Sequence, residues 1–326
     1  MGLIQKVPVT VLTGYLGAGK TTLLNRILTE EHGQRIAVIV NEFGEVGIDH
    51  QLVIDTDEEI FEMNNGCICC TVRGDLIRII SNLMARTDKF DHLVIETTGL
   101  ADPAPVIQSF FVDETMAKQT QLDAVVTVVD AQHIDSHWDS DEAQEQIAFA
   151  DVVLLNKLDL ITAEQMEALT TKVRGLNAIA AIHPTQNCDI NLNRVLGIQA
   201  FNLQQALSID PQLLDEDAHE HDSTVSSIAL SEIGSVDSDK LNRWLYQLVQ
   251  AKGTDIFRMK GIFDVDNEPR RFVCQGVHMT LDGRPGKPWQ ADEVRRSEVV
   301  FIGRNLDEMA LREGFISCFN QVYAYA

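Results

Sequence analysis

A glycine-rich loop follows the first apolar run of the chain, where residues 9–24 read VTVLTGYLGAGKTTLL. The apolar residues before the loop are typical of a buried strand, and the pattern after it is typical of a helix. Residues 14–21 match the complete Walker A spacing, G-x-x-x-x-G-K-T. Gly14, Gly17 and Gly19 let backbone N–H groups curl around a pyrophosphate, and the helix N-terminus adds partial positive charge. The segment therefore predicts a phosphate-binding loop.

Three side chains at the end of this loop complete the predicted phosphate site. We expect Lys20 to reach the β- and γ-phosphates and the Thr21 hydroxyl to ligate Mg²⁺. Thr22 belongs to the same nucleotide-binding set. The expected ligand is therefore a nucleoside di- or triphosphate with Mg²⁺.

Apolar runs alternate with helical patterns up to about residue 200. The predicted strands are Val7–Thr13, Ile36–Asn41, Glu59–Met63, His92–Glu96, Leu122–Asp130, Val152–Asn156 and Ala178–His183; the predicted helices are Thr21–Glu31, Val72–Arg86, Ser140–Ala150 and Ala163–Val173. Near-continuous apolar strands are expected in a parallel sheet that is covered on both faces. The pattern predicts an α/β fold with a doubly wound, mostly parallel P-loop sheet.

The composition changes after residue 207. Residues 208–223 read SIDPQLLDEDAHEHDS, an acidic stretch with few apolar residues that is typical of a linker. Beyond it we expect strands at Thr224–Leu230, Asp255–Val265, Arg270–Met279 and Arg296–Ile302, and helices at Asp237–Ala251 and Asn305–Phe319. The chain is predicted to have a P-loop domain at residues 1–207 and a smaller α+β domain at residues 224–326.

A second polar segment ends an apolar run at residues 92–99, which read HLVIETTG. Glu96 ends the predicted strand, and Gly99 follows three residues later. This arrangement suits a carboxylate near Mg²⁺ and a loop whose glycine N–H approaches a γ-phosphate. We expect Glu96 and Gly99, together with Lys20, to serve hydrolysis, with Glu96 either orienting water or supporting the metal.

A third polar segment, N-K-x-D, follows the predicted strand Val152–Asn156. Asp159 can accept two charge-assisted hydrogen bonds from the N1 and N2 positions of guanine, whereas adenine lacks the matching donors. Asn156 can pair with the base and with the loop backbone, while the stem of Lys157 packs over the ring. The motif predicts GTP and GDP as the ligands.

Three cysteines crowd into residues 64–71, which read NNGCICCT. Cys67, Cys69 and Cys70 can supply three ligands to one thiophilic ion and leave a fourth position open. Water, a client ligand or a carboxylate such as Glu42 or Glu45 could fill that position. A redox pair between Cys67 and Cys69 and inert packing are the alternatives.

Other candidate residues carry weaker signals. His219 and His221 lie in the acidic stretch and fit either a secondary metal site or a solvated linker. His92 and His133 have no partner that is visible in the sequence. Cys188, Cys274 and Cys318 stand alone and are expected to be small buried hydrophobic residues.

The charge of the chain excludes several classes of partner. It has 26 Lys and Arg against 49 Asp and Glu, a formal net charge of −23. Such a surface repels nucleic acids and anionic membranes, so neither is expected as a partner. No run approaches the ~18 apolar residues of a membrane span, and no secretion signal precedes the first strand. The expected location is cytoplasmic.

Taken in this order, the Walker A, E-x-x-G, N-K-x-D and C-x-C-C motifs resemble those of the CobW-type metal-chaperone GTPases, relatives of the urease and hydrogenase nickel-insertion GTPases. The likeness covers almost the whole chain. Residues 41–45 (NEFGE) and 96–103 (ETTGLADP) look like the two switch segments of that family, and residues 259–277 look like part of its C-terminal domain.

This resemblance implies Mg²⁺-dependent GTP binding, slow GTP hydrolysis and handling of Zn²⁺ or Co²⁺. Cys67, Cys69 and Cys70 would hold the metal, helped by Glu42 or Glu45, and an unidentified metalloprotein client would receive it. Association between copies of the chain stays open. A redox-sensing switch or a GTP-dependent interaction module without metal delivery are the alternatives. The short histidine run argues against metal storage.

Overall fold

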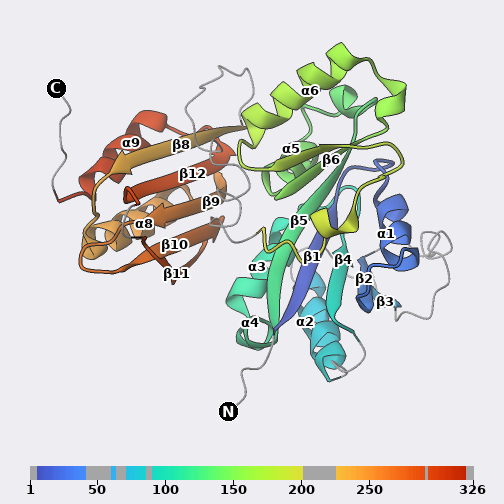
Figure 1. Cartoon of the computed structure of the whole chain (residues 1–326), viewed down its shortest axis with the longest axis horizontal. Helices are drawn as coiled ribbons and strands as arrows, with labels where there is room; N and C mark the ends of the chain where they lie inside the picture. Colours follow the sequence, from blue (N-terminus) through green and yellow to red (C-terminus); the bar gives the residue numbers. More distant parts are fainter. Residues whose placement is uncertain are drawn as a thin grey trace. The chain divides into compact units, whose positions relative to one another are not determined.

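The computed structural model describes residues 6–41, 60–63, 71–85, 90–200, 225–290 and 293–320. The first unit is built on a seven-stranded sheet in the order β3-β2-β4-β1-β5-β6-β7 (Figure 1). Its strands are β1 (Val7–Thr13), β2 (Ile36–Asn41), β3 (Ile60–Met63), β4 (His92–Glu96), β5 (Thr120–Asp130), β6 (Val152–Asn156) and β7 (Ala181–Pro184). Every neighbouring pair is parallel, so the carboxyl ends of all seven strands lie along one edge.

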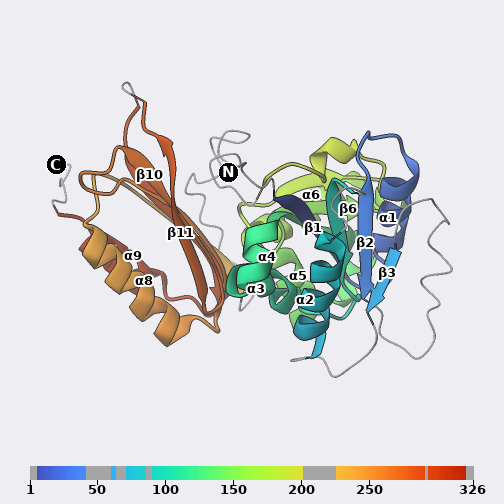
Figure 2. The ribbon, with the colours of Figure 1, turned by 90° about the horizontal axis from the view of Figure 1, so that it is seen from below.

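Helices cover both faces of this sheet, as the apolar strands predict. They are α1 (Lys20–Thr29), α2 (Thr71–Met84), α3 (Ala104–Val112), α4 (Glu114–Gln119), α5 (Asp141–Ala148) and α6 (Ala163–Leu176). Figure 2 shows α1 on one side of the sheet and α2, α3 and α4 on the other. Leu23, Leu24 and Ile27 of α1 pack on Val126 and Leu154 of the sheet, and all five are almost fully buried. The doubly wound P-loop fold is confirmed.

The helices α3 and α4 were not predicted. Prolines flank the start of α3, and its side chains include five buried ones, so the helix lacks the polar face that makes a helical period visible. Asp113 ends α3 and caps α4, because its carboxylate accepts hydrogen bonds from the N–H groups of Thr115 and Met116, both at 2.9 Å.

The second unit contains a five-stranded antiparallel sheet in the order β11-β10-β9-β12-β8. Its strands are β8 (Val225–Ile233), β9 (Ile256–Phe263), β10 (Arg270–Val277), β11 (Thr280–Pro288) and β12 (Arg296–Arg304). Two helices, α8 (Ser238–Lys252) and α9 (Glu308–Ser317), share a core with this sheet that includes Met259, Phe301 and Phe315. The predicted α+β architecture is confirmed. The strand β11 was missed because Gly283 and Pro285 read as a turn, although an edge strand tolerates proline.

By its contacts the chain divides into two compact units, Met1–Lys172 with Ala180–Phe201, and Asn202–Ala326 with Val173–Ile179. The predicted boundaries at residues 207 and 224 stay a prediction, and the predicted linker 208–223 lies outside the described residues. Among the helices that the structure describes, none is both long and apolar enough to cross a membrane.

Candidate nucleotide site

The glycine-rich loop joins the end of β1 to the start of α1. Gly14, Gly17 and Gly19 have φ values of +140°, +73° and +115°, a region that favours glycine. A β-carbon on Gly14 would lie only 2.2 Å from the carbonyl oxygen of Val128 on β5. Gly19 directly precedes α1, and no side chain caps its first N–H groups. The loop therefore leaves backbone donors at a helix N-terminus, the usual arrangement for binding a phosphate.

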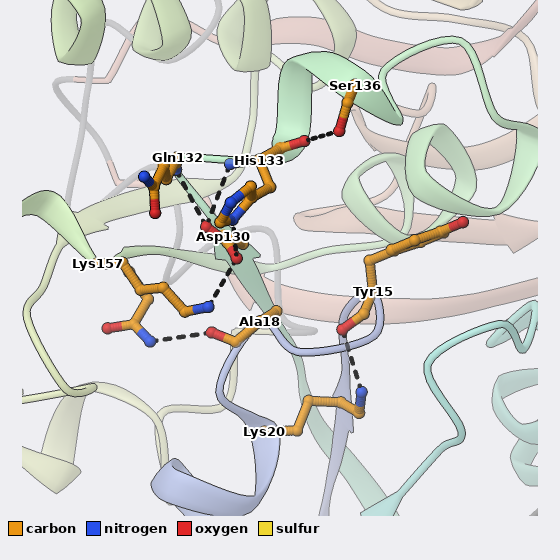
Figure 3. A network of polar contacts seen from close by, with 9 residues as sticks. Tyr15, Ala18, Lys20, Asp130, Gln132, His133, Ser136 and Lys157 are labelled. Carbon is orange, nitrogen blue, oxygen red and sulfur yellow. Dashed lines mark hydrogen bonds and ion pairs between the residues drawn. The ribbon is translucent and has the colours of Figure 1, made fainter. Parts of the chain in front are cut away.

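Lys20 lies inside the curve of this loop. Its ammonium donates hydrogen bonds to the carbonyl oxygens of Gly14 at 2.8 Å and Tyr15 at 3.3 Å, the second of which is drawn in Figure 3. The residue is only 9% exposed, so the cation is held among the loop's own polar groups. Thr21 is half-buried and Thr22 is exposed, both in the first turn of α1.

The two strands beside β1, and the next strand after β5, end in a polar residue at the edge where the loop lies. These are Glu96 on β4, Asp130 on β5 and Asn156 on β6, each less than 10% exposed. Glu96 is paired with Leu12 of β1, and Asp130 is paired with Asn156. Parallel strands bring their carboxyl ends to one crevice, which is where ligands bind in such sheets.

The segment after Glu96 packs against the glycine-rich loop. The Thr97 hydroxyl donates to the Thr13 hydroxyl at 2.8 Å, and the Thr97 N–H donates to the carbonyl of Leu12 at 2.9 Å. A β-carbon on Gly99 would lie 2.8 Å from the amide nitrogen of Leu16. Only glycine therefore allows this close approach of two backbones, and Gly99 lies directly beside the loop.

Asp130 is the centre of a polar network that the sequence motifs did not reveal (Figure 3). Its Oδ2 accepts hydrogen bonds from Lys157 Nζ at 2.7 Å and from His133 Nδ1 at 2.9 Å. Its Oδ1 accepts from the N–H groups of Gln132 and His133. Burial opposes ionisation of Asp130, but hydrogen bonds from Lys157 and His133 outweigh it and lower the pKa of the carboxyl. His133 therefore does have a partner, and Asp130 could have been suspected as the third strand that ends in a polar residue.

The Asn156 side chain joins three segments of backbone. Its Nδ2 donates to the carbonyl of Ala18 in the glycine-rich loop at 2.9 Å. Its Oδ1 accepts from the Cys188 N–H at 2.9 Å and from the Thr185 hydroxyl at 3.3 Å. Neither the contact with the glycine-rich loop nor the one with the segment after β7, which holds Thr185 and Cys188, was anticipated. Asn156 thus fixes the loop relative to the strand ends.

Asp159 lies apart from this buried network. It is exposed, within a short 3-10 helix at Leu158–Leu160, and it lines a shallow groove together with Arg26, Thr185 and Gln186. Arg26 of α1 forms an ion pair with Asp189 at 2.9 Å and donates to the carbonyl of Cys188. A carboxylate at this open groove is accessible to the polar edge of a base.

The cysteines divide into two sets. Cys188, Cys274 and Cys318 are free and buried, as predicted, and burial raises the pKa of Cys188 and Cys274 to about 12 and that of Cys318 to about 11. The predicted metal residues, namely Cys67, Cys69, Cys70, Glu42 and Glu45, lie outside the described residues, as do His219 and His221. Within the described part of the chain, no group of three or more His, Cys, Asp or Glu could hold a metal ion.

Comparison with protein families matches both parts of the chain. Residues 8–184 match the family model of the CobW/HypB/UreG nucleotide-binding domain, and residues 225–319 match that of the cobalamin synthesis protein cobW C-terminal domain. Together the two matches include every strand and α-helix given above, apart from Val7 at the start of β1.

Curated relatives match over nearly the full chain. The zinc chaperone YjiA of Escherichia coli is 39% identical, with 96% of this chain and 98% of that protein covered. The zinc chaperone CobW of Pseudomonas aeruginosa is 36% identical, with 95% and 91% covered. The zinc-regulated GTPase metalloprotein activator 1 of Schizosaccharomyces pombe is 32% identical, with 94% and 84% covered. The crystal structure of the Zn(II)-bound YjiA GTPase superimposes with a TM-score of 0.78 over 96% of this chain and 99% of that chain, at 33% identity.

Proposed function

Because the chain belongs to the CobW/HypB/UreG family of nucleotide-binding proteins, we propose that it binds and slowly hydrolyses GTP and delivers Zn²⁺ to a client protein under nucleotide control. Members of the family are GTPases, and several relatives are named zinc chaperones or zinc-regulated metalloprotein activators. What remains to be tested is the assignment of residues, the coupling between the two ligands and the transfer itself.

For the phosphates, we assign the loop Gly14–Gly19, Lys20, Thr21 and Thr22. The positive φ values of the glycines and the uncapped start of α1 support this assignment, since they leave N–H groups available for phosphate oxygens. Lys20 would exchange its two carbonyl partners for the β- and γ-phosphates.

Mg²⁺ fits the oxygen donors at this edge of the sheet. The Thr21 hydroxyl would hold it, and Glu96 would support it or orient the attacking water, because Glu96 is buried beside the strand that leads into the loop. When bound, Mg²⁺ neutralises charge on the β- and γ-phosphate oxygens. Gly99 would bring its N–H towards the γ-phosphate from its position against Leu16.

For the base, we assign the recognition of guanine to Asp159. Its exposed carboxylate in the groove can accept from both N–H positions of the guanine edge. Asn156 has a different task, because its amide is engaged with Ala18, Cys188 and Thr185. Lys157 is held by Asp130, which leaves its stem available beside the base.

For the metal, we assign Zn²⁺ to Cys67, Cys69 and Cys70, with Glu42 or Glu45 as an additional ligand. Three thiolates suit Zn²⁺, and an open fourth position suits a site that must release its metal. The names of the relatives favour Zn²⁺ over Co²⁺, which the same ligands would also bind. The cysteines follow β3 and precede α2 in the chain, inside the nucleotide-binding domain.

This position in the chain is the observation that carries the proposed coupling. The edge strand β3 is parallel to its neighbour β2, so its carboxyl end, after which the cysteines follow in the sequence, lies at the edge that also holds Glu96 and the glycine-rich loop. GTP·Mg²⁺ would order residues 41–47, engage residues 97–102 and tighten the metal site, and hydrolysis would loosen it. The coupling must be reciprocal, and typical values of about 1–3 kcal/mol correspond to changes in affinity of roughly 5–150-fold.

The test is a Zn²⁺ competition titration with a Mg²⁺-GTP analogue and again with Mg²⁺-GDP, followed by the same titration with Co²⁺. We expect tight 1:1 binding that weakens from the GTP analogue to GDP and is lost in the double variant Cys69→Ser/Cys70→Ser. Cys274→Ala, which removes a buried thiol of the other unit, is the matched control and should bind normally. Equal affinity in both nucleotide states would contradict nucleotide-gated transfer and leave a GTPase with a structural metal. An absence of cysteine-dependent binding would favour the redox switch.

A further inference from the structure

A buried glutamine on α5 contacts the segment that follows Glu96. Gln146 is only 1% exposed, although it carries an uncharged polar side chain at the end of a short helix. Its Nε2 donates to two main-chain carbonyls, that of Gly99 at 3.2 Å and that of Ala101 at 3.1 Å. Both N–H bonds of the amide are therefore used on one turn of the chain. A buried amide is tolerated only when its donors are satisfied in this way.

The turn that Gln146 holds is closed by a hydrogen bond of its own and packs against the glycine-rich loop. The Ala101 N–H donates to the carbonyl of Thr98 at 3.1 Å, which closes residues 98–101 into a turn. On one side of this turn, Gly99 packs against the backbone of Leu16 in the glycine-rich loop. The Gln146 amide bonds to two carbonyls of the same turn. The position of Gly99 relative to the loop is thus set by two independent contacts.

The main chain of Gln146 is also anchored to the sheet. The Thr127 hydroxyl of β5 donates to the Gln146 carbonyl at 2.6 Å. Thr127 is paired with Thr13, the last residue of β1, and the Thr13 hydroxyl accepts from Thr97. A short chain of contacts therefore runs from the strand that leads into the glycine-rich loop, through α5, to the turn at residues 98–101.

Beside Gln146 the structure leaves space. A cavity of about 320 Å³ is lined by Gln146, Leu16 and Gly17, together with residues at the end of β5. The residues of α5 that line it are Ala143, Gln146 and Ile147, and of these three side chains only that of Gln146 can donate hydrogen bonds to the turn. The amide is therefore the contact on α5 that we expect to hold the turn.

From these contacts we propose that Gln146 is a positioning residue for GTP hydrolysis, which holds the turn at residues 98–101 where Gly99 can meet the γ-phosphate. The inference rests on the proposed role of Gly99 as the group that senses the γ-phosphate. Gln146 touches neither nucleotide nor Mg²⁺ in this scheme and acts through the backbone of the turn. Its loss should thus affect GTP, which has a γ-phosphate, and spare GDP, which has none.

The experiment compares Gln146→Leu with Gln144→Leu. Gln144 lies on the same helix, is 6% exposed and donates from Nε2 to the carbonyl of Trp138 at 3.0 Å. Gln144→Leu therefore removes a similar side-chain hydrogen bond to a carbonyl outside the turn at residues 98–101. For each protein, the affinities for a Mg²⁺-GTP analogue and for Mg²⁺-GDP, the kcat for GTP and the melting temperature are measured. For Gln146→Leu we expect GTP-analogue affinity and kcat to fall about 30-fold, the loss expected for two neutral hydrogen bonds, with GDP affinity within about twofold. Gln144→Leu should match the wild type in the ratio of the two affinities.

Gln146→Met is a second variant of similar length and volume, which protects the test against misfolding of Gln146→Leu. It removes both donors without adding a charge, so it should lower GTP-analogue affinity and kcat by a similar factor. An unchanged ratio in both Gln146 variants, or an equal change in Gln144→Leu, would overturn the proposal. The wild type separates the two hypotheses: if it does not bind GTP, the proposed function fails and the inference fails with it, whereas GTP hydrolysis that is insensitive to Gln146 overturns the inference alone.

Discussion

Replacing Asn156 with alanine should weaken the binding of every nucleotide by a similar factor, whatever its base. The reason is that the side chain is 2% exposed and bonds to protein atoms, the carbonyl of Ala18 at 2.9 Å, the N–H of Cys188 at 2.9 Å and the hydroxyl of Thr185 at 3.3 Å. Its contact with Ala18 lies inside the glycine-rich loop, which we assign to the phosphates and not to the base.

The size of the effect follows from these contacts. A neutral hydrogen bond contributes about 1 kcal/mol net, and a buried partner left unpaired costs about 1–3 kcal/mol. The alanine variant leaves the Ala18 carbonyl and the Cys188 N–H without the amide, so we expect the free energy of unfolding to fall by about 2–6 kcal/mol. Part of this free energy holds the glycine-rich loop in its binding conformation. In the variant, nucleotide binding must supply that part, so nucleotide affinity should weaken about 10- to 100-fold.

The assay is competition of GTP, ATP and inorganic triphosphate against a fluorescent GTP analogue. Asn156→Ala should weaken all three by the same factor. Asp159→Asn is the contrasting variant: it should weaken GTP, leave inorganic triphosphate unchanged and improve the binding of XTP, because an amide can donate to the second carbonyl of xanthine. If Asn156→Ala weakened the affinity for GTP alone, the reasoning would be refuted and Asn156 would be assigned to recognition of the base.

Three further predictions concern stability and reactivity. Burial, with a smaller contribution from His32, lowers the pKa of His92 from 6.5 to about 4. Between these two pH values the unfolded chain therefore binds a proton that the folded chain does not, and the free energy of unfolding should fall by up to about 3 kcal/mol as the pH drops from about 6.5 to 4. Urea unfolding of the wild type at several pH values should show this slope, and His92→Gln should lack it. Gly14→Ala should destabilise the protein by about 2–6 kcal/mol in thermal unfolding, since the positive φ and the 2.2 Å approach to the Val128 carbonyl both penalise a β-carbon. A loss of stability under about 1 kcal/mol would contradict this. Finally, a thiol reagent should modify at most three of the six cysteines in the native, metal-free protein, because Cys188, Cys274 and Cys318 are buried and their pKa values are raised. More than three modified cysteines before unfolding would be inconsistent with this burial.

Much of the sheet could be predicted because its strands are nearly continuous apolar runs that end in a polar residue. Two of those ends, Glu96 and Asn156, belong to recognisable motifs. Asp130 ends its strand in the same way but belongs to no motif, and its partner Lys157 follows a strand that begins more than twenty residues later. The sequence therefore indicates the strand end, while the ion pair depends on the pairing of β5 with β6.

Other parts of the site could not be predicted because they involve main-chain atoms. Gln146 donates to the carbonyls of Gly99 and Ala101, and Asn156 donates to that of Ala18, but every residue has a carbonyl. No pattern of side chains marks which one is the partner. The same holds for Cys188, whose N–H is directed to Asn156 by a left-handed backbone with φ of +54°, a conformation that is uncommon for cysteine.

The central place of β1 in its sheet has a consequence for how the protein is made. This strand precedes all others in the sheet, yet its two neighbours are β4 and β5. Val9 is therefore paired on both sides only after Leu93 and Leu122 have been synthesised. At roughly 5–20 residues per second, a ribosome needs on the order of ten seconds to reach the end of β5. Both edges of this apolar strand are open until β4 is made, and one edge stays open until β5 is made; an open edge is a known template for aggregation. Synthesis of this protein should therefore depend on cellular chaperones that shield its first strand.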